Sequence, residues 1–128
     1  MYIRFHGNYA SPYTKQPYGI FVVIYHLKRD GKLTAEDCAK YDDTVSWFEE
    51  HLPIPPYYKE SNNAQRAVTW FKHTEAVRPL IDQLQPFFDI AGKYGVEILK
   101  SAADQLPGTI IYEDEYQVAV TAYTPKRE

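Results

Sequence analysis

The stretch TAEDCAKYDDTVSWFEEHLP (residues 34–53) decides the fold, because it predicts one well-delimited amphipathic helix. Thr34 is a good N-cap, and Glu36 and Asp37 place negative charge in the first turn, where the helix dipole favours it. Pro53 ends the helix, since proline has no backbone N–H to continue it. A single apolar stripe, with steps of three and four residues, marks the buried face: Cys38, Tyr41, Val45, Phe48 and Leu52.

The preceding segment, residues 20–29, is compatible with either a strand or a helix. Its β-branched run fits a buried strand, whereas a helix would gather four apolar residues on one face: Ile20, Val23, Ile24 and Leu27. We favour the helix, because Lys28 and Arg29 suit a C-terminal turn and Gly31 can supply the left-handed cap. Further toward the N-terminus, residues 1–5 predict a short strand and residues 7–19 a loop.

On the C-terminal side, the proline-rich residues 52–58 predict an extended arm, followed by a polar loop. A helix is predicted at 75–92, which Pro86 kinks or splits. Strands are predicted at 66–72, 96–101, 109–112 and 117–123. The order β-α-α-β-α-β-β-β predicts an α+β fold, with one mostly antiparallel sheet of about five strands and helices packed on one face. The strand, helix and strand within residues 66–101 form the only candidate right-handed crossover unit.

Length and composition indicate one globular domain over residues 1–128. The chain is 45% hydrophobic and 16% aromatic, which excludes intrinsic disorder. Its longest apolar run, residues 20–25, is too short for a membrane span, and no signal peptide is expected, so we predict a cytoplasmic location without membrane contact. The net charge of −3 makes nucleic acid an unfavoured partner.

Three motifs carry a resemblance to known sequences. They are W-F-x3-L-P-x-P at residues 47–55, W-F-K at 70–72 and P-G-x-I-x-Y-E-D at 107–114. In these motifs the chain resembles a family of small uncharacterised bacterial proteins. The resemblance implies helices in both early segments and a bacterial or phage source. It implies no activity, cofactor or catalytic residue.

The common catalytic and metal-binding patterns are missing from the sequence. The four histidines lack helical ligand spacing, and neither a phosphate-binding glycine loop nor a nucleophile elbow occurs. Cys38 falls on the apolar stripe of the helix 34–53, which favours a core position over a reactive thiol. We therefore expect no metal and no cofactor, and we lean against enzymatic activity.

One candidate binding site lies where strand 66–72 would lead into helix 75–92. Helix N-termini attract phosphate and carboxylate groups through unpaired N–H donors and the helix dipole. Positive charge could be added from the junction and from neighbouring strands, which gives the candidate residues Lys72, His73, Thr74, Arg66 and Arg4. The plainer interpretation is an ordinary capped helix start with Lys72 in solvent.

Tyrosine is the most unusual feature of the composition, with 12 in all. Rings in loops offer large contact areas at low entropy cost, which suits an interface. The candidate interface residues are Tyr13, Tyr18, Pro55, Pro56, Tyr57, Tyr58 and Tyr116. Our first hypothesis is a non-enzymatic module that uses these rings and an acidic helix face to bind another protein or itself. The alternative is a binder, with hydrolysis left open, of a phosphate- or carboxylate-bearing small molecule at Lys72, His73 and Thr74.

Overall fold

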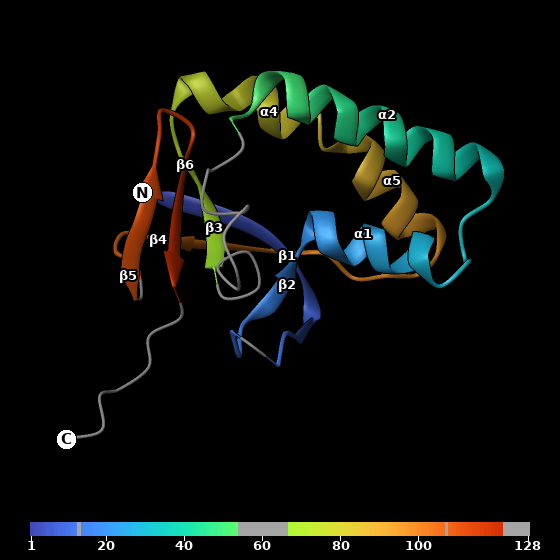
Figure 1. Ribbon diagram of the computed structural model, residues 1–128, viewed down its shortest axis with the longest axis horizontal. Coiled ribbons are helices and arrows are strands. Elements are labelled where there is room, and N and C mark those ends of the chain that lie inside the picture. Colours follow the sequence, from blue (N-terminus) through green and yellow to red (C-terminus); the bar gives the residue numbers. More distant parts are fainter. Residues whose placement is uncertain (13, 54–66, 107, 122–128) are drawn as a thin grey trace.

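A six-stranded antiparallel sheet forms one layer of the protein (Figure 1). The computed structural model describes residues 1–12, 14–53, 67–106 and 108–121. The strands are β1 (Tyr2–Ala10), β2 (Pro17–Gly19), β3 (Ala67–Lys72), β4 (Leu99–Ala103), β5 (Thr109–Glu113) and β6 (Gln117–Thr121). Every described strand pair is antiparallel, in agreement with the predicted, mostly antiparallel sheet.

The long strand β1 lies at the centre of the topology. Its first residues pair with β3 on one edge and with β4 on the other, so that Ile3 lies beside both Phe71 and Ala102. After β1 the chain reverses in a hairpin, so that β2 pairs with the second half of β1. Because β3 and β4 both run antiparallel to β1, they are parallel to each other across it, and the helical segment after β3 connects them.

The helices within the described residues are α1 (Ile20–Arg29), α2 (Ala35–His51), η2 (Glu75–Val77), α4 (Arg78–Asp82) and α5 (Gln85–Lys93). Figure 1 shows α1, α2 and α5 gathered together beside the sheet. Their apolar faces form one core with residues of β1 and β3: Ile3, Phe71, Ile20, Ile24, Phe48, Leu84, Phe87 and Ile90. The α+β class with helices against one face of the sheet is therefore confirmed. No helix within the described ranges is both long and apolar enough to cross a membrane.

Both early helices form where the sequence predicts them. The α1 segment is helical, and Gly31 has a φ of 71° just after it, in the left-handed region that suits glycine. The Thr34 hydroxyl caps α2 by accepting a hydrogen bond of 3.1 Å from the Asp37 N–H. On the predicted stripe of α2, Phe48 is buried, while the other members are partly buried.

The predicted loop at residues 7–19 is wrong over much of its length. β1 continues to Ala10, and Pro17–Gly19 form β2, so only a tight connection remains between them. Ser11 and Gln16 close this connection with a backbone hydrogen bond of 2.9 Å, and Lys15 turns the chain with a φ of 62°. Glycine, proline and serine favour a loop there, but β2 is an edge strand, where proline is tolerated.

The predicted helix 75–92 is divided into three short pieces. Pro79 and Pro86 lie in the first turns of α4 and α5, where the missing N–H removes no helical hydrogen bond. The split at Pro86 is confirmed, whereas the single long helix is not. The next strand starts later than predicted, at Leu99 instead of Val96. The predicted arm lies, beyond Pro53, outside the described residues.

The opposite face of the sheet carries a second apolar cluster. Val68, Val118 and Val120 are buried there, with Tyr2, Trp70 and Leu106 packed against them. In the pairing of β3 with β6, Trp70 lies beside Val118 and Val68 beside Val120, so these side chains share one face. Phe71 and Gln117, also register partners, lie on the helix side. The β3–β6 pair is thus buried on both faces.

Candidate functional site

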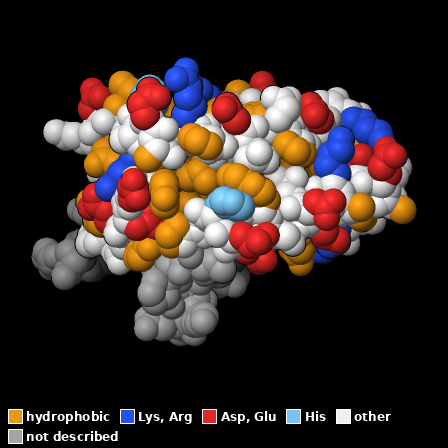
Figure 2. All heavy atoms as spheres, turned by 90° about the horizontal axis from the view of Figure 1, so that it is seen from above, with side chains coloured by type: hydrophobic (Ala, Val, Ile, Leu, Met, Phe, Trp, Pro, Cys, Tyr) orange, Lys and Arg blue, Asp and Glu red, His pale blue; other side chains and the backbone are white. Residues whose placement is uncertain are grey.

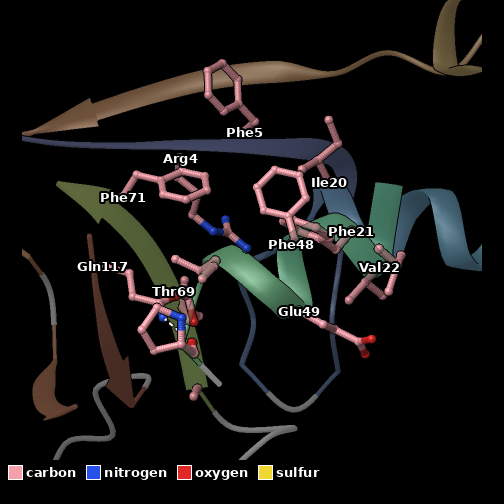
Figure 3. Close-up of a pocket in the computed structure, with 16 residues that line it drawn as sticks. Arg4, Phe5, Ile20, Phe21, Val22, Phe48, Glu49, Thr69, Phe71 and Gln117 are labelled. Carbon is pink, nitrogen blue, oxygen red and sulfur yellow. Dashed lines mark hydrogen bonds between the residues drawn. The ribbon is translucent and has the colours of Figure 1, made fainter. Parts of the chain in front are cut away.

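A pocket of about 440 Å³ lies between the sheet and helices α1 and α2 (Figure 3). Its walls are mainly apolar, and β1, β3, α1 and α2 each contribute to them. Their principal residues are Phe5, Ile20, Phe21, Val45, Phe48 and Phe71. This volume lies within the range of small-molecule binding sites, which are concave and mostly apolar.

The aromatic walls are held in place by contacts with one another. Phe21 meets Phe48 edge to face at 5.0 Å between ring centroids, and it meets Phe87 at 5.2 Å in the same manner. Phe48 and Phe87 are themselves buried, so this cluster links α1, α2 and α5. Edge-to-face packing fixes ring orientation, and the pocket is therefore preformed.

Arg4 is the unusual residue of the pocket. Its exposed fraction is only 8%, and its guanidinium donates a hydrogen bond to the carbonyl oxygen of Pro17 at the start of β2. Figure 3 shows the side chain reaching into the pocket between Phe71 and Phe48. Burial lowers the pKa of Arg4 to about 10, because the charged form loses hydration. The guanidinium still carries its charge at neutral pH.

No acidic side chain of the described residues forms an ion pair with Arg4. The only carboxylate among the described lining residues belongs to Glu49, which is exposed. Figure 3 shows that carboxylate directed away from the guanidinium. A buried charge is costly unless it is paired, so the positive charge of Arg4 lacks compensation from the part of the chain that is described.

The other polar residues of the pocket already have partners. The amide nitrogen of Gln117 donates to the Pro53 carbonyl at 2.8 Å and to Asp114 at 3.1 Å, which joins the end of α2 to β6. Thr69 supplies the hydroxyl group of the pocket wall, and no histidine or cysteine occurs among its described lining residues. This set of groups suits binding by charge and shape better than covalent chemistry.

Most of the other buried polar side chains are paired within the protein, whereas Trp70 Nε1 is buried without a hydrogen-bond partner among the described residues. His6 Nδ1 donates to the Gly7 carbonyl at 2.8 Å, so the Ser101 hydroxyl donates to Nε2 at 2.7 Å. This pair resembles a base beside a nucleophile, but neither residue lines the pocket, and the bond joins β1 to β4. Over the described ranges, no group of three or more histidine, cysteine or acidic side chains could hold a metal ion.

The predicted anion-site residues Lys72, His73 and Thr74 lie where β3 ends and η2 begins. Lys72 forms an ion pair of 2.7 Å with Glu113 on β5, and His73 and Thr74 are exposed. The helix that follows is the three-residue η2, too short to gather the unpaired N–H groups on which the hypothesis depends. Arg66 lies outside the described residues, and Arg4 is directed into the pocket.

Two of the predicted interface tyrosines are described, and both are partly buried. Tyr18 packs edge to face on His26 at 4.8 Å, and Tyr9 lies 5.3 Å from Tyr18 between ring centroids. Tyr116 packs against the main core. The others fall outside the described residues: Tyr13, Pro55, Pro56, Tyr57 and Tyr58.

Burial, ion pairing and neighbouring side chains reduce the exposed negative charge on the predicted acidic face of the second helix. Asp37 is buried, and Asp42 forms an ion pair of 2.7 Å with Lys28, which leaves Glu36, Asp43, Glu49 and Glu50 exposed. Figure 2, which views the molecule from above, shows acidic side chains dispersed among apolar and basic ones. This view shows no continuous acidic surface.

The sequence identified Arg4 as a candidate for the Lys72 site, whereas the structure places it in the pocket. A usable signal existed, because Arg4 stands between Ile3 and Phe5 in a strand that is otherwise rich in apolar residues. The pocket walls carried no such signal, since phenylalanines in helices and strands are ordinary core residues.

Comparisons with known proteins were made at the level of families, sequences and structures. No family model, curated protein or solved structure matches the chain. The function is therefore argued from the charge, the size and the walls of the pocket.

Proposed function

We propose that this protein binds a small organic anion with an apolar body in the pocket between the sheet and helices α1 and α2. Arg4 would hold the anionic group, and Phe21, Phe48 and Phe71 would surround the apolar body. One observation carries the proposal: Arg4, a buried residue, lines an apolar pocket without an acidic partner among the described residues.

The physical reason is compensation of a buried charge. The guanidinium has five N–H donors, and the Pro17 carbonyl is its only described hydrogen-bond partner. An anion would supply both opposite charge and acceptors, and such charge-assisted hydrogen bonds are roughly twice as strong as neutral ones. The apolar walls would strengthen the attraction, because they exclude water from the contact.

The experiment compares a charged ligand with neutral molecules of nearly the same shape. Isothermal titration calorimetry with octanoate, octanamide and octanol is expected to give measurable binding for octanoate and far weaker binding for the other two. Arg4→Met should abolish octanoate binding. Arg78→Met is the matched control, because Arg78 is largely exposed and lies outside the pocket. Equal binding of octanoate and octanol, or octanoate binding retained by Arg4→Met, would refute the proposal.

A second proposal is that the protein binds another protein or a second copy of itself. Exposed apolar side chains on α1 and β1 support this proposal. Tyr9, Val22 and Tyr25 expose 41%, 38% and 47% of their surface, and the Tyr9 hydroxyl lies 2.7 Å from His26 Nδ1. A bacterial or phage source, a cytoplasmic location and the absence of a nucleic-acid partner belong to the same proposal. Sedimentation velocity of wild type and Tyr25→Ser tests self-association: a wild-type dimer that Tyr25→Ser dissociates supports it.

A further inference from the structure

We infer that the pocket is specific for monocarboxylates and discriminates against phosphate monoesters and dicarboxylates. This inference rests on the proposed function and names the class of ligand for the same site. Two observations carry it: the charges of the described lining residues, and the volume that those residues enclose.

The charges of the described lining residues match a ligand with one negative charge. Arg4 is the only cation among the described lining residues, and Glu49 is the only acid. A monocarboxylate on Arg4 leaves the buried end of the pocket neutral. A phosphate monoester carries between one and a half and two negative charges at neutral pH, so part of its charge would stay uncompensated in apolar surroundings.

Glu49 adds to this selection. Glu49 is exposed, and it lines the same pocket as the buried Arg4. A second anionic group that stays within the pocket would either lie against the apolar walls or approach this like charge, and both placements are unfavourable. The arrangement therefore tolerates one anionic end and disfavours two.

Geometry also favours a carboxylate. Arginine presents a planar fork of donors that matches the two oxygens of a carboxylate. A lysine would act as a point charge without this directional preference. The described lining residues include Arg4 and no lysine. A planar acceptor with a single charge can accept from the Arg4 donors that have no described partner, without bringing surplus charge into the pocket.

The volume limits the size of the apolar body. An apolar cavity of about 150 Å³ accommodates benzene, which has six non-hydrogen atoms. By the same ratio, the 440 Å³ of this pocket accommodate at most about 18 non-hydrogen atoms. Octanoate and simple bicyclic aromatic acids are within this limit, whereas a nucleotide exceeds it and carries too much charge.

The test measures dissociation constants of octanoate, suberate and octyl phosphate by isothermal titration calorimetry at neutral pH. Octanoate is expected to bind at least about tenfold more tightly than either dianion, the effect of one poorly compensated charge. Glu49→Gln should lower the dissociation constants of the two dianions and so reduce the difference from octanoate. Glu50→Gln is the matched control, because Glu50 is exposed on the same helix but does not line the pocket.

The outcomes separate this inference from the proposed function. If octyl phosphate binds as tightly as octanoate and Arg4→Met abolishes both, the monocarboxylate specificity is refuted and anion binding at Arg4 stands. If Glu49→Gln and Glu50→Gln change dianion binding equally, the role given to Glu49 is refuted. If none of the three anions binds, or if Arg4→Met leaves their binding unchanged, the proposed function fails together with the inference.

Discussion

Lys93 Nζ lies 2.9 Å from the Oδ2 of Asp37, so the buried carboxylate at the start of α2 is paired with an ammonium group at the end of α5. The Tyr94 hydroxyl donates to the same oxygen at 2.6 Å. Asp37 is thus an example of how this fold compensates a buried charge. Arg4 is equally inaccessible but has only a carbonyl partner among the described residues, and this contrast is the basis of the proposed function.

We predict that Arg4→Met does not destabilise the protein. The substitution removes one hydrogen bond to Pro17, worth about 1 kcal/mol, but it also removes the cost of burying an unpaired charge. The free energy of unfolding, measured with urea, should remain within about 1 kcal/mol of wild type or rise. A loss above about 2 kcal/mol would show that Arg4 mainly fastens β2 and would contradict its assignment as a ligand-binding residue.

A second prediction concerns acid stability. Hydrogen bonds from Tyr94 and then from Lys93 lower the pKa of Asp37 to about 2, against an ordinary value of 3.8. Since the native state favours the charged carboxylate, its contribution to stability is complete above the ordinary pKa and is lost as the pH falls toward 2. Urea unfolding between pH 2 and pH 6 should therefore show a decline at the acid end.

Tyr94→Phe tests the cause of this decline. Removing the hydroxyl takes away the largest contribution to the lowered pKa, so the pKa of Asp37 should rise and the acid-dependent loss of stability should become smaller. An acid profile identical to that of wild type would show that other carboxyl groups determine it, such as Asp114, whose pKa is also lowered.

A third prediction uses two glycines with opposite surroundings. A Cβ added at Gly7 would lie 2.8 Å from Cγ2 of Val23, a buried residue of α1, so Gly7→Ala should force α1 away from β1 and cost about 1–3 kcal/mol. Gly92 lies in α5 with no atom within 4 Å of the added Cβ, and Gly92→Ala should stabilise by about 0.5–1 kcal/mol. Equal effects in chemical denaturation would contradict the packing of α1 on β1.

The parts of the fold that the sequence predicts well depend on local signals. The α2 helix combines a capping threonine, first-turn acids and an apolar stripe, and each of these acts within a few residues. The hairpin of β5 and β6 is similarly local, because Asp114 accepts hydrogen bonds from the N–H groups of Tyr116 and Gln117 in the connection. Such elements need little information from the rest of the chain.

The errors arise where pairing with another segment of the chain, and not a local sequence signal, determines the structure. β1 extends to Ala10 because residues 17–19 return beside it, and no pattern within residues 7–19 reveals that pairing. The same limit applies to the site, because Arg4 becomes a pocket residue through its contact with Pro17, thirteen positions away. At Lys72 the surroundings also come from elsewhere in the chain: Glu113 on β5 pairs with this lysine, and the expected long helix is only η2 at its start.

A crystal structure of the protein with octanoate would show whether Arg4 holds the anionic group. We expect both carboxylate oxygens within about 3 Å of the Arg4 guanidinium, with the alkyl chain against Phe48 and Phe71. This expectation would be contradicted by an acidic side chain of the protein itself paired with Arg4, or by octanoate bound elsewhere while the pocket at Arg4 remains unchanged.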